Sequence, residues 1–230
     1  MKTTAKIFLS LLLSTLTSVS FAQMNDYAST GKLQAKSEDA AKILRDIVAI
    51  PDDTIPESLL QKATCIATFP NVIRIGFGFG VRFGKGLVSC RVPGGWSNPS
   101  FMKVKGGSWG LQIGASSTDL ILVFVKDNAP ERLSVGNFTV GGDASVAVGP
   151  VGRHLEAGTD YQLNSEIYAY SQSRGLFAGL TIEGALMNVD DSANITTYGR
   201  DVDAKKLLTT EFKGNRTVNA YVNALNDVVH

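Results

Sequence analysis

Ile75-Gly76-Phe77-Gly78-Phe79-Gly80 is the stretch that decides the fold. Glycine alternates along it with a large apolar residue, as in a β-strand that packs one face closely against neighbouring backbone. Leu120-Ile121-Leu122-Val123-Phe124-Val125 is a continuous apolar run, which predicts a strand covered on both faces. Further strands are predicted at residues 86–92, 138–148, 166–173 and 176–189, the last two separated by a hairpin turn at Arg174-Gly175.

Helices are predicted on both sides of this strand-rich region. After Ser37 or Glu38, apolar residues recur at three- and four-residue spacing until Pro51, and a second helix is predicted from Pro56 to the residues before Pro70. Residues 203–208 and 218–229 repeat the helical spacing near the C-terminus. The predicted fold class is therefore α+β: a curled or closed antiparallel Gly-rich β-sheet flanked by N- and C-terminal helices.

The first residues have the parts of an export signal. Lys2 and Lys6 precede a short apolar run, and Ser20-Phe21-Ala22 supplies small residues for cleavage after Ala22. The run is too short to span a bilayer comfortably, although an uncleaved anchor is the alternative. We therefore expect a signal peptide at 1–22, a flexible leader at 23–36 and one domain at 37–230. The mature protein is expected to be periplasmic or secreted, with peripheral attachment to a membrane as one option.

Charge is distributed in blocks along the chain. Without residues 1–22 the basic residues number 20 and the acidic ones 21, so net charge says nothing about partners. Between Ser58 and Thr118, however, there is no Asp or Glu. The basic residues of this block are Lys62, Arg74, Arg82, Lys85, Arg91, Lys103 and Lys105. Such asymmetry predicts a basic face that attracts anions. A nucleic-acid partner is not expected, because the mature chain is slightly acidic and exported.

The chain contains two cysteines, Cys65 and Cys90. In an oxidising compartment an even pair predicts one disulfide, and two buried free thiols are the alternative. A metal site would need more ligands than the two cysteines and two histidines provide. No metal and no cofactor is therefore expected.

Short matches to catalytic motifs fail on their context. Gly106-Gly107-Ser108-Trp109-Gly110 fits G-x-S-x-G, but strand-like sequence follows Ser108 where a nucleophile elbow needs a helix. His154 would have to serve as the base, with Asp160 to orient it. A serine hydrolase using Ser108 is thus a minor alternative to a non-enzymatic role. The oxygen-rich run Asp190-Asp191-Ser192-Ala193-Asn194 is interpreted as a polar turn, since it lacks the pattern of a calcium loop.

Several ordered blocks resemble one known family. They are Ile55-Pro56 with Cys65-Ile66-Ala67, then residues 76–80, 84–86, 95–100, 107–114, 142–153 and 168–179, and finally Asn194 and Tyr198-Gly199. Together they resemble the SYLF domain family over roughly Lys36 to Leu208. The resemblance implies a lipid-binding domain, which in eukaryotic members is also associated with actin. Actin binding is not expected for an exported chain, whereas binding to anionic phospholipids in the cell envelope is. The alternative is a protein-interaction or structural component of the envelope.

Two groups of basic residues are the predicted lipid contacts. Lys42 and Arg45 flank the apolar stripe of the first helix, which could lie in a headgroup layer or pack on a core. The remaining contacts are predicted to be Arg74, Arg82, Lys85, Arg91, Lys103 and Lys105, interleaved with aromatic residues. Arg82 and Lys85 are the preferred contacts, because they are expected in an exposed turn between strands.

Overall fold

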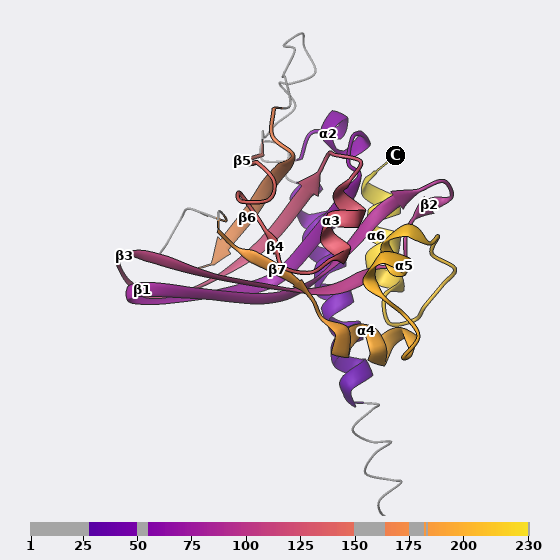
Figure 1. Ribbon diagram of the computed structural model, residues 1–230, viewed down its shortest axis with the longest axis horizontal. Coiled ribbons are helices and arrows are strands. Elements are labelled where there is room, and N and C mark those ends of the chain that lie inside the picture. Colours follow the sequence, from indigo (N-terminus) through magenta and orange to yellow (C-terminus); the bar gives the residue numbers. More distant parts are fainter. Residues whose placement is uncertain (1–27, 50–54, 150–163, 175–181, 183, 230) are drawn as a thin grey trace, which may run out of the picture.

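The computed structural model describes residues 28–49, 55–149, 164–174, 182 and 184–229. After a helix at residues 28–49, the elements are α2 (Glu57–Gln61), β1 (Cys65–Val92), β2 (Gly95–Trp96), β3 (Ser100–Phe124), α3 (Ala129–Ser134), β4 (Phe138–Thr139), β5 (Val146–Val148), β6 (Ile167–Arg174), β7 (Leu186–Val189), α4 (Asp191–Tyr198), α5 (Ala204–Thr209) and α6 (Asn219–Val228). The predicted α+β class, with a curled sheet between N- and C-terminal helices, is confirmed (Figure 1).

The two longest strands, β1 and β3, form an antiparallel two-stranded ribbon. Their register runs from Cys65 opposite Phe124 to Val88 opposite Ser100. In Figure 1 the bend in the middle of this ribbon extends well away from the helices. β6 pairs with one end of β3 and β7 with its other end, and β4 and β5 lie outside them. Among the strands of the described residues all pairs are antiparallel except β5 with β6, so the sheet predicted to be antiparallel contains one parallel pair there.

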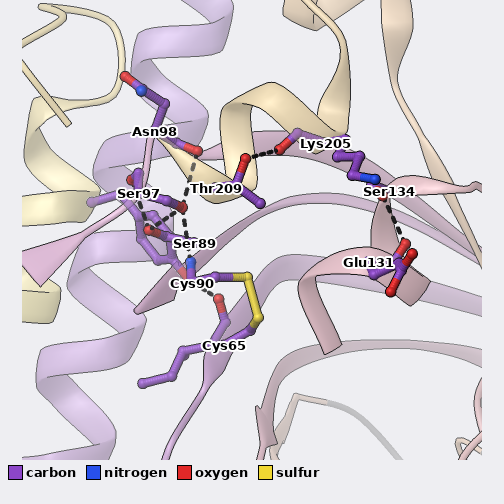
Figure 2. The surroundings of a disulfide bond; sticks show 11 residues. Cys65, Ser89, Cys90, Ser97, Asn98, Glu131, Ser134, Lys205 and Thr209 are labelled. Atoms are coloured by element: carbon purple, nitrogen blue, oxygen red, sulfur yellow. Dashed lines mark hydrogen bonds between the residues drawn. A yellow bond between two sulfur atoms is a disulfide. The ribbon is translucent and has the colours of Figure 1, made fainter. Parts of the chain in front are cut away.

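The ribbon doubles back on itself, so that the two ends of β1 meet. A disulfide joins Cys65 to Cys90 (Figure 2), and the Arg91 N–H donates to the Thr64 carbonyl over 2.7 Å. A Cβ added to Gly86 would lie 2.2 Å from the Thr68 carbonyl oxygen. Glycine is therefore required where the returning half of β1 crosses the outgoing half. The predicted disulfide is confirmed.

Two hydrophobic clusters hold the doubled ribbon. One lies between its halves and includes Phe69 and Val72 from the outgoing half with Val88 and Val104 from the returning half. The other joins the ribbon to the helices at residues 28–49, α2 and α6. Tyr221 on α6 is fully buried there, and its hydroxyl donates to the Ile66 carbonyl at 3.0 Å. The helices thus cover the base of the ribbon, which is the region where the two ends of β1 meet. They leave the bend in the middle of the ribbon uncovered.

Some predicted elements differ from the structure. The first helix already includes residues 28–36, which were expected to be a flexible leader. Alanine, glutamine and lysine in this segment have high helix propensity, and Leu33 packs against the core. The second helix ends at Gln61 rather than continuing toward Pro70, because residues 65–69 pair with β3. Asp190–Asn194 was expected to be a turn, but it begins α4, with Asp190 as its N-cap.

Other predictions fall partly or wholly outside the described residues. These are the signal peptide, the hairpin at Arg174-Gly175 beyond its first residue, and the strand at 176–189 before Ile182. The C-terminal helices are confirmed as α5 and α6. Within the part of the chain that the structure describes, no helix is long and apolar enough to cross a membrane.

Candidate functional site

An apolar strip lies along the exposed face of β1 near the bend of the ribbon. It consists of Ile73, Ile75, Phe79, Val81 and Phe83, whose exposed fractions run from 37% to 65%. Alternate residues of a strand point to the same face; Val72, just before the strip, and Arg82, between Val81 and Phe83, are buried. Most of the large hydrophobic residues that are exposed in the described part of the chain belong to this strip. Such a concentration marks an interaction surface.

A pocket of about 370 Å³ opens beside this strip. Phe83 belongs to both, and the remaining lining residues are Lys36, Pro70, Asn71, Gly84, Lys85, Lys103, Val104 and Lys105. We call this the lysine pocket. Register explains how the sequence builds it: Lys85 is opposite Lys103 in the ribbon, and Phe83 is opposite Lys105. Lys36 comes from the first helix, which covers the base of the ribbon at this point.

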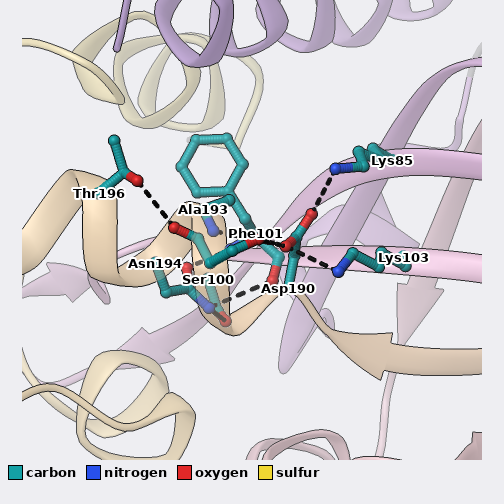
Figure 3. A network of polar contacts seen from close by, with 9 residues as sticks. Lys85, Ser100, Phe101, Lys103, Asp190, Ala193, Asn194 and Thr196 are labelled. Carbon is teal, nitrogen blue, oxygen red and sulfur yellow. Dashed lines mark hydrogen bonds and ion pairs between the residues drawn. The ribbon is translucent and has the colours of Figure 1, made fainter. Parts of the chain in front are cut away.

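A buried carboxylate holds two of these lysines. Lys85 Nζ lies 2.8 Å from Asp190 Oδ2, and Lys103 Nζ lies 2.8 Å from Asp190 Oδ1 (Figure 3). The Asp190 side chain is 1% exposed. Burial raises its pKa, but hydrogen bonds from Lys103, Lys85 and Ser192 outweigh burial and lower the pKa to about 2. Asp190 is therefore charged at neutral pH and holds both ammonium groups against its carboxylate, at the edge of the pocket.

Asn194 fixes the start of α4 against β3, which places Asp190. Its Oδ1 accepts the Phe101 N–H at 2.8 Å, and its Nδ2 donates to Ser100 Oγ at 3.1 Å (Figure 3). Asp190 N–H in turn donates to the Phe101 carbonyl at 2.9 Å. α4 is therefore anchored directly beside the lysines of β3.

The structure brings only three of the eight predicted lipid contacts together. Lys85, Lys103 and Lys105 line the lysine pocket. Arg82 was expected in an exposed turn, but it lies inside β1 and is 6% exposed. Burial and the nearby Arg74 lower its pKa. Because side chains alternate along β1, Arg74 and Arg82 lie on the face opposite the apolar strip. The exposed turn predicted at Arg82 and Lys85 is wrong, since both residues lie within β1.

The other three predicted contacts have partners away from the pocket. Lys42 pairs with Asp46 one turn along the same helix, and Arg45 Nη2 lies 2.8 Å from Asp227 on α6. The Arg91 guanidinium lies over the Trp96 ring, 4.9 Å from its centroid. The apolar stripe between Lys42 and Arg45 is buried, with Leu44 fully covered. Of the two alternatives for this helix, the structure thus shows a helix packed on the core.

The residues of the catalytic alternative give no triad. The backbone of Ser108 lies within β3, where the chain continues as strand beyond Gly110. His154 and Asp160 lie outside the described residues. Among those that are described, no group of three or more His, Cys, Asp or Glu side chains could hold a metal ion.

Sequence reasoning missed three features of the site. Lys36 was assigned to the leader, and Asp190 to a turn, although Asp is a favoured N-cap residue and the structure shows Asp190 capping α4. The apolar strip was hidden because Phe79 and Phe83 are exposed, whereas Trp96 and Phe101, equally aromatic, are buried. Alternation alone does not tell which face of a strand a helix will cover.

Comparison with known proteins identifies the family. The profile described as Ysc84, Las17-binding protein actin regulator, matches residues 105–229. Human SH3 domain-containing YSC84-like protein 1 is 37% identical over 183 residues, which are 76% of this chain and 53% of the human protein. The chain belongs to the Ysc84 family, to which the SYLF resemblance pointed.

Two further relatives show how widely the domain occurs. The Xenopus laevis SH3 domain-containing YSC84-like protein 1 is 38% identical over 74% of this chain and 52% of its own length. Protein YSC84 of Saccharomyces cerevisiae is 34% identical over 79% of this chain and 40% of its own length. The chain thus spans about half the length, or less, of these relatives.

Proposed function

We propose that this Ysc84-family domain is a non-enzymatic binder of anionic phospholipid surfaces in the cell envelope. The observation that carries the proposal is the apolar strip of β1 directly beside the lysine pocket. Large apolar side chains next to ammonium groups suit a lipid interface, where acyl chains lie just beneath anionic headgroups. We further propose that the protein acts after export, as the features of residues 1–22 indicate.

The lysine pocket and the apolar strip would contribute to binding in different ways. Basic residues close to an anionic membrane contribute about 1 kcal/mol each, so the lysines would give weak, reversible attraction. Full burial of one large apolar side chain is worth about 1.5–3 kcal/mol, and the strip residues, which are already partly covered, would gain part of this on insertion. The lysines would therefore select anionic surfaces, and the strip would add salt-resistant affinity. In this arrangement the face of the ribbon that carries the apolar strip and the lysine pocket meets the membrane.

Vesicle sedimentation of the mature protein tests the proposal. Wild type should pellet with anionic vesicles and much less with neutral ones, and binding should weaken as salt shortens the Debye length from about 10 Å at 0.1 M. Val81→Asp should weaken binding by about tenfold or more. Val135→Asp is the matched control, because Val135 is 78% exposed but lies after α3, outside the strip. Equal binding by both variants, or no preference for anionic vesicles, would contradict the proposal.

A protein-binding role is the second candidate. The family profile carries the words Las17-binding protein actin regulator, and an exposed apolar strip also suits a protein partner. For this chain the partner would be a protein of the envelope. Failure of wild type to pellet with any vesicle, together with Val81-dependent cross-linking to an envelope protein, would favour this candidate.

A further inference from the structure

The two halves of β1 meet along a line that we call the seam, and each half belongs to a different group of strands. The outgoing half, which begins at Cys65, pairs with the C-terminal part of β3, and β6 extends this group. The returning half pairs with the N-terminal part of β3, and β7 and β4 extend that group. At the seam Gly86 lies against Thr68, and the Arg91 N–H donates to the Thr64 carbonyl. The two groups of strands are thus continuous through the bend and meet again at the seam.

The lysine pocket lies across this seam. Pro70 and Asn71 come from the outgoing half, whereas residues 83–85 come from the returning half. The halves approach closely here, since a Cβ added to Gly84 would lie 2.9 Å from the Val72 side chain. Because the two sides of the pocket belong to different halves, the pocket keeps its shape only while the seam stays closed.

The Cys65–Cys90 disulfide is a covalent clamp on the seam. It joins the two halves directly, and the chain contains no other cysteine. Both cysteines are fully buried, so a reductant has no direct access to them in the folded protein. Their redox state is therefore set before the seam closes. Forming the bond removes two electrons and two protons from the thiols, and a disulfide exchange partner in an oxidising compartment takes them up as its own two thiols.

The position of the bridge lets it act on the pocket. Lys85 lies about halfway along β1 between Cys90 and the bend, which is the pivot of the two halves. An opening at the base would therefore reach the pocket at about half its size. Binding sites need their groups held within about 0.5 Å, so an opening of about 1 Å at the base is enough to disturb the pocket.

We propose that the Cys65–Cys90 bridge controls the binding surface: the bridge closes the seam and assembles the lysine pocket, and the bridge-free protein folds with the pocket open. The effect on membrane binding rests on the proposed function, whereas the effect on the seam does not. A chain that meets an oxidising compartment only after export would gain its affinity for anionic surfaces there. The same chain with free thiols would bind such surfaces weakly.

Hydrogen exchange measured by mass spectrometry tests the seam. Oxidised mature protein is compared with Cys65→Ala/Cys90→Ala, at a temperature where circular dichroism shows both to be folded. Wild type refolded with dithiothreitol, which keeps both thiols reduced, is a second bridge-free form that leaves no cavity. Without the bridge, we expect the amides of residues 66–72 and 83–89 to exchange at least about tenfold faster, and those of α6 to change much less.

Leu133→Ala on α3 is the matched control for a loss of stability. Leu133 is buried but lines no part of the pocket, so its truncation destabilises the fold without cutting the clamp. It should leave the exchange pattern along the seam as in wild type. Unchanged exchange along the seam in both bridge-free forms, or the same acceleration in Leu133→Ala, would overturn the inference.

Vesicle sedimentation then connects the seam to binding. Oxidised and bridge-free protein are compared on phosphatidylcholine vesicles that contain phosphatidylglycerol. If about a tenth of the bridge-free molecules have the pocket assembled, their apparent affinity falls about tenfold. Leu133→Ala should pellet like wild type. Equal pelleting by oxidised and bridge-free protein would overturn the inference and keep the proposed function. No pelleting of oxidised wild type would contradict the proposed function, and exchange along the seam would still decide whether the bridge closes it.

Discussion

The base of the β1–β3 ribbon, where its two ends meet, and the bend in its middle have similar sequences but opposite environments. At the base, Phe69, Leu87 and Val88 are fully buried, and Gly86 and Ser89 flank the last two. Toward the bend, Phe79 and Phe83 alternate with glycine and arginine, and both are exposed. Helices at residues 28–49, α2 and α6 cover the base but do not reach the bend (Figure 1).

This difference separates residues that stabilise the fold from residues that are available for binding. A strand that alternates large and small side chains needs a covering layer on its apolar face. Where that layer is missing, the apolar face stays in water at a cost, unless another surface covers it. The comparison therefore predicts large effects on stability at the base and small ones near the bend.

The largest effect is expected where the ribbon crosses itself. In Gly86→Ala the new Cβ would lie 2.2 Å from the Thr68 carbonyl and 2.7 Å from the Phe69 ring, so backbone must move. We expect a loss of about 3 kcal/mol or more in the free energy of unfolding. Gly107→Ala, near the bend, is the matched control, because its Cβ would meet only the Gly80 carbonyl at 3.9 Å. Urea denaturation compares the two, and similar losses would contradict the distinction between base and bend.

The disulfide should have the next largest effect. Cys65 and Cys90 are 25 residues apart and join the outgoing and returning halves of β1 (Figure 2). In the chain-entropy model a loop of this length stabilises by about 3 kcal/mol. Cys65→Ala/Cys90→Ala should therefore unfold at lower temperature than wild type under non-reducing conditions. Reductant should lower the melting temperature of wild type only. An identical melting temperature for variant and wild type would show that packing alone closes the ribbon.

Much of the fold could be predicted from the sequence because local patterns determine it. The Gly-rich alternation predicted strand at residues 75–80, helical spacing predicted α5 and α6, and a pair of cysteines in a chain expected to be exported predicted the bridge. These signals depend on neighbouring residues or on the compartment alone. Contacts with distant segments therefore do not change these predictions.

The site was less predictable because it depends on contacts between distant segments. Arg82 and Lys85 are three residues apart and therefore lie on opposite faces of β1, and contacts with distant segments decide which of the two faces is covered. Lys36 and Asp190 reach the same lysines from opposite ends of the chain. No pattern within one segment contains that information. The basic block at residues 58–118 indicated an anion-binding surface but could not say which of its members lie together.

Asp190 lies at the boundary between base and bend, and its replacement should have the smallest of the three effects. Asp190→Asn keeps an N-cap for α4, since Asn caps as well as Asp, but it removes the charge that holds Lys85 and Lys103. We expect a loss of about 1–2 kcal/mol in the free energy of unfolding at neutral pH. Asp191→Asn, at an exposed position on the first turn of α4, is the control and should cost less.

The pH dependence of that loss distinguishes the charge of Asp190 from its packing. Its pKa in the folded protein is about 2, below the ordinary value of 3.8, so the unfolded chain binds the proton more tightly. The stability that the charge provides is fully present above pH 3.8 and is lost as the pH falls toward 2. The difference between wild type and Asp190→Asn, measured by urea denaturation, should therefore be constant from pH 7 to about 5 and shrink between about 4 and 2. A difference that stays the same at low pH would mean that Asp190 acts through its shape and hydrogen bonds, and that the lysines beside it do not depend on its charge.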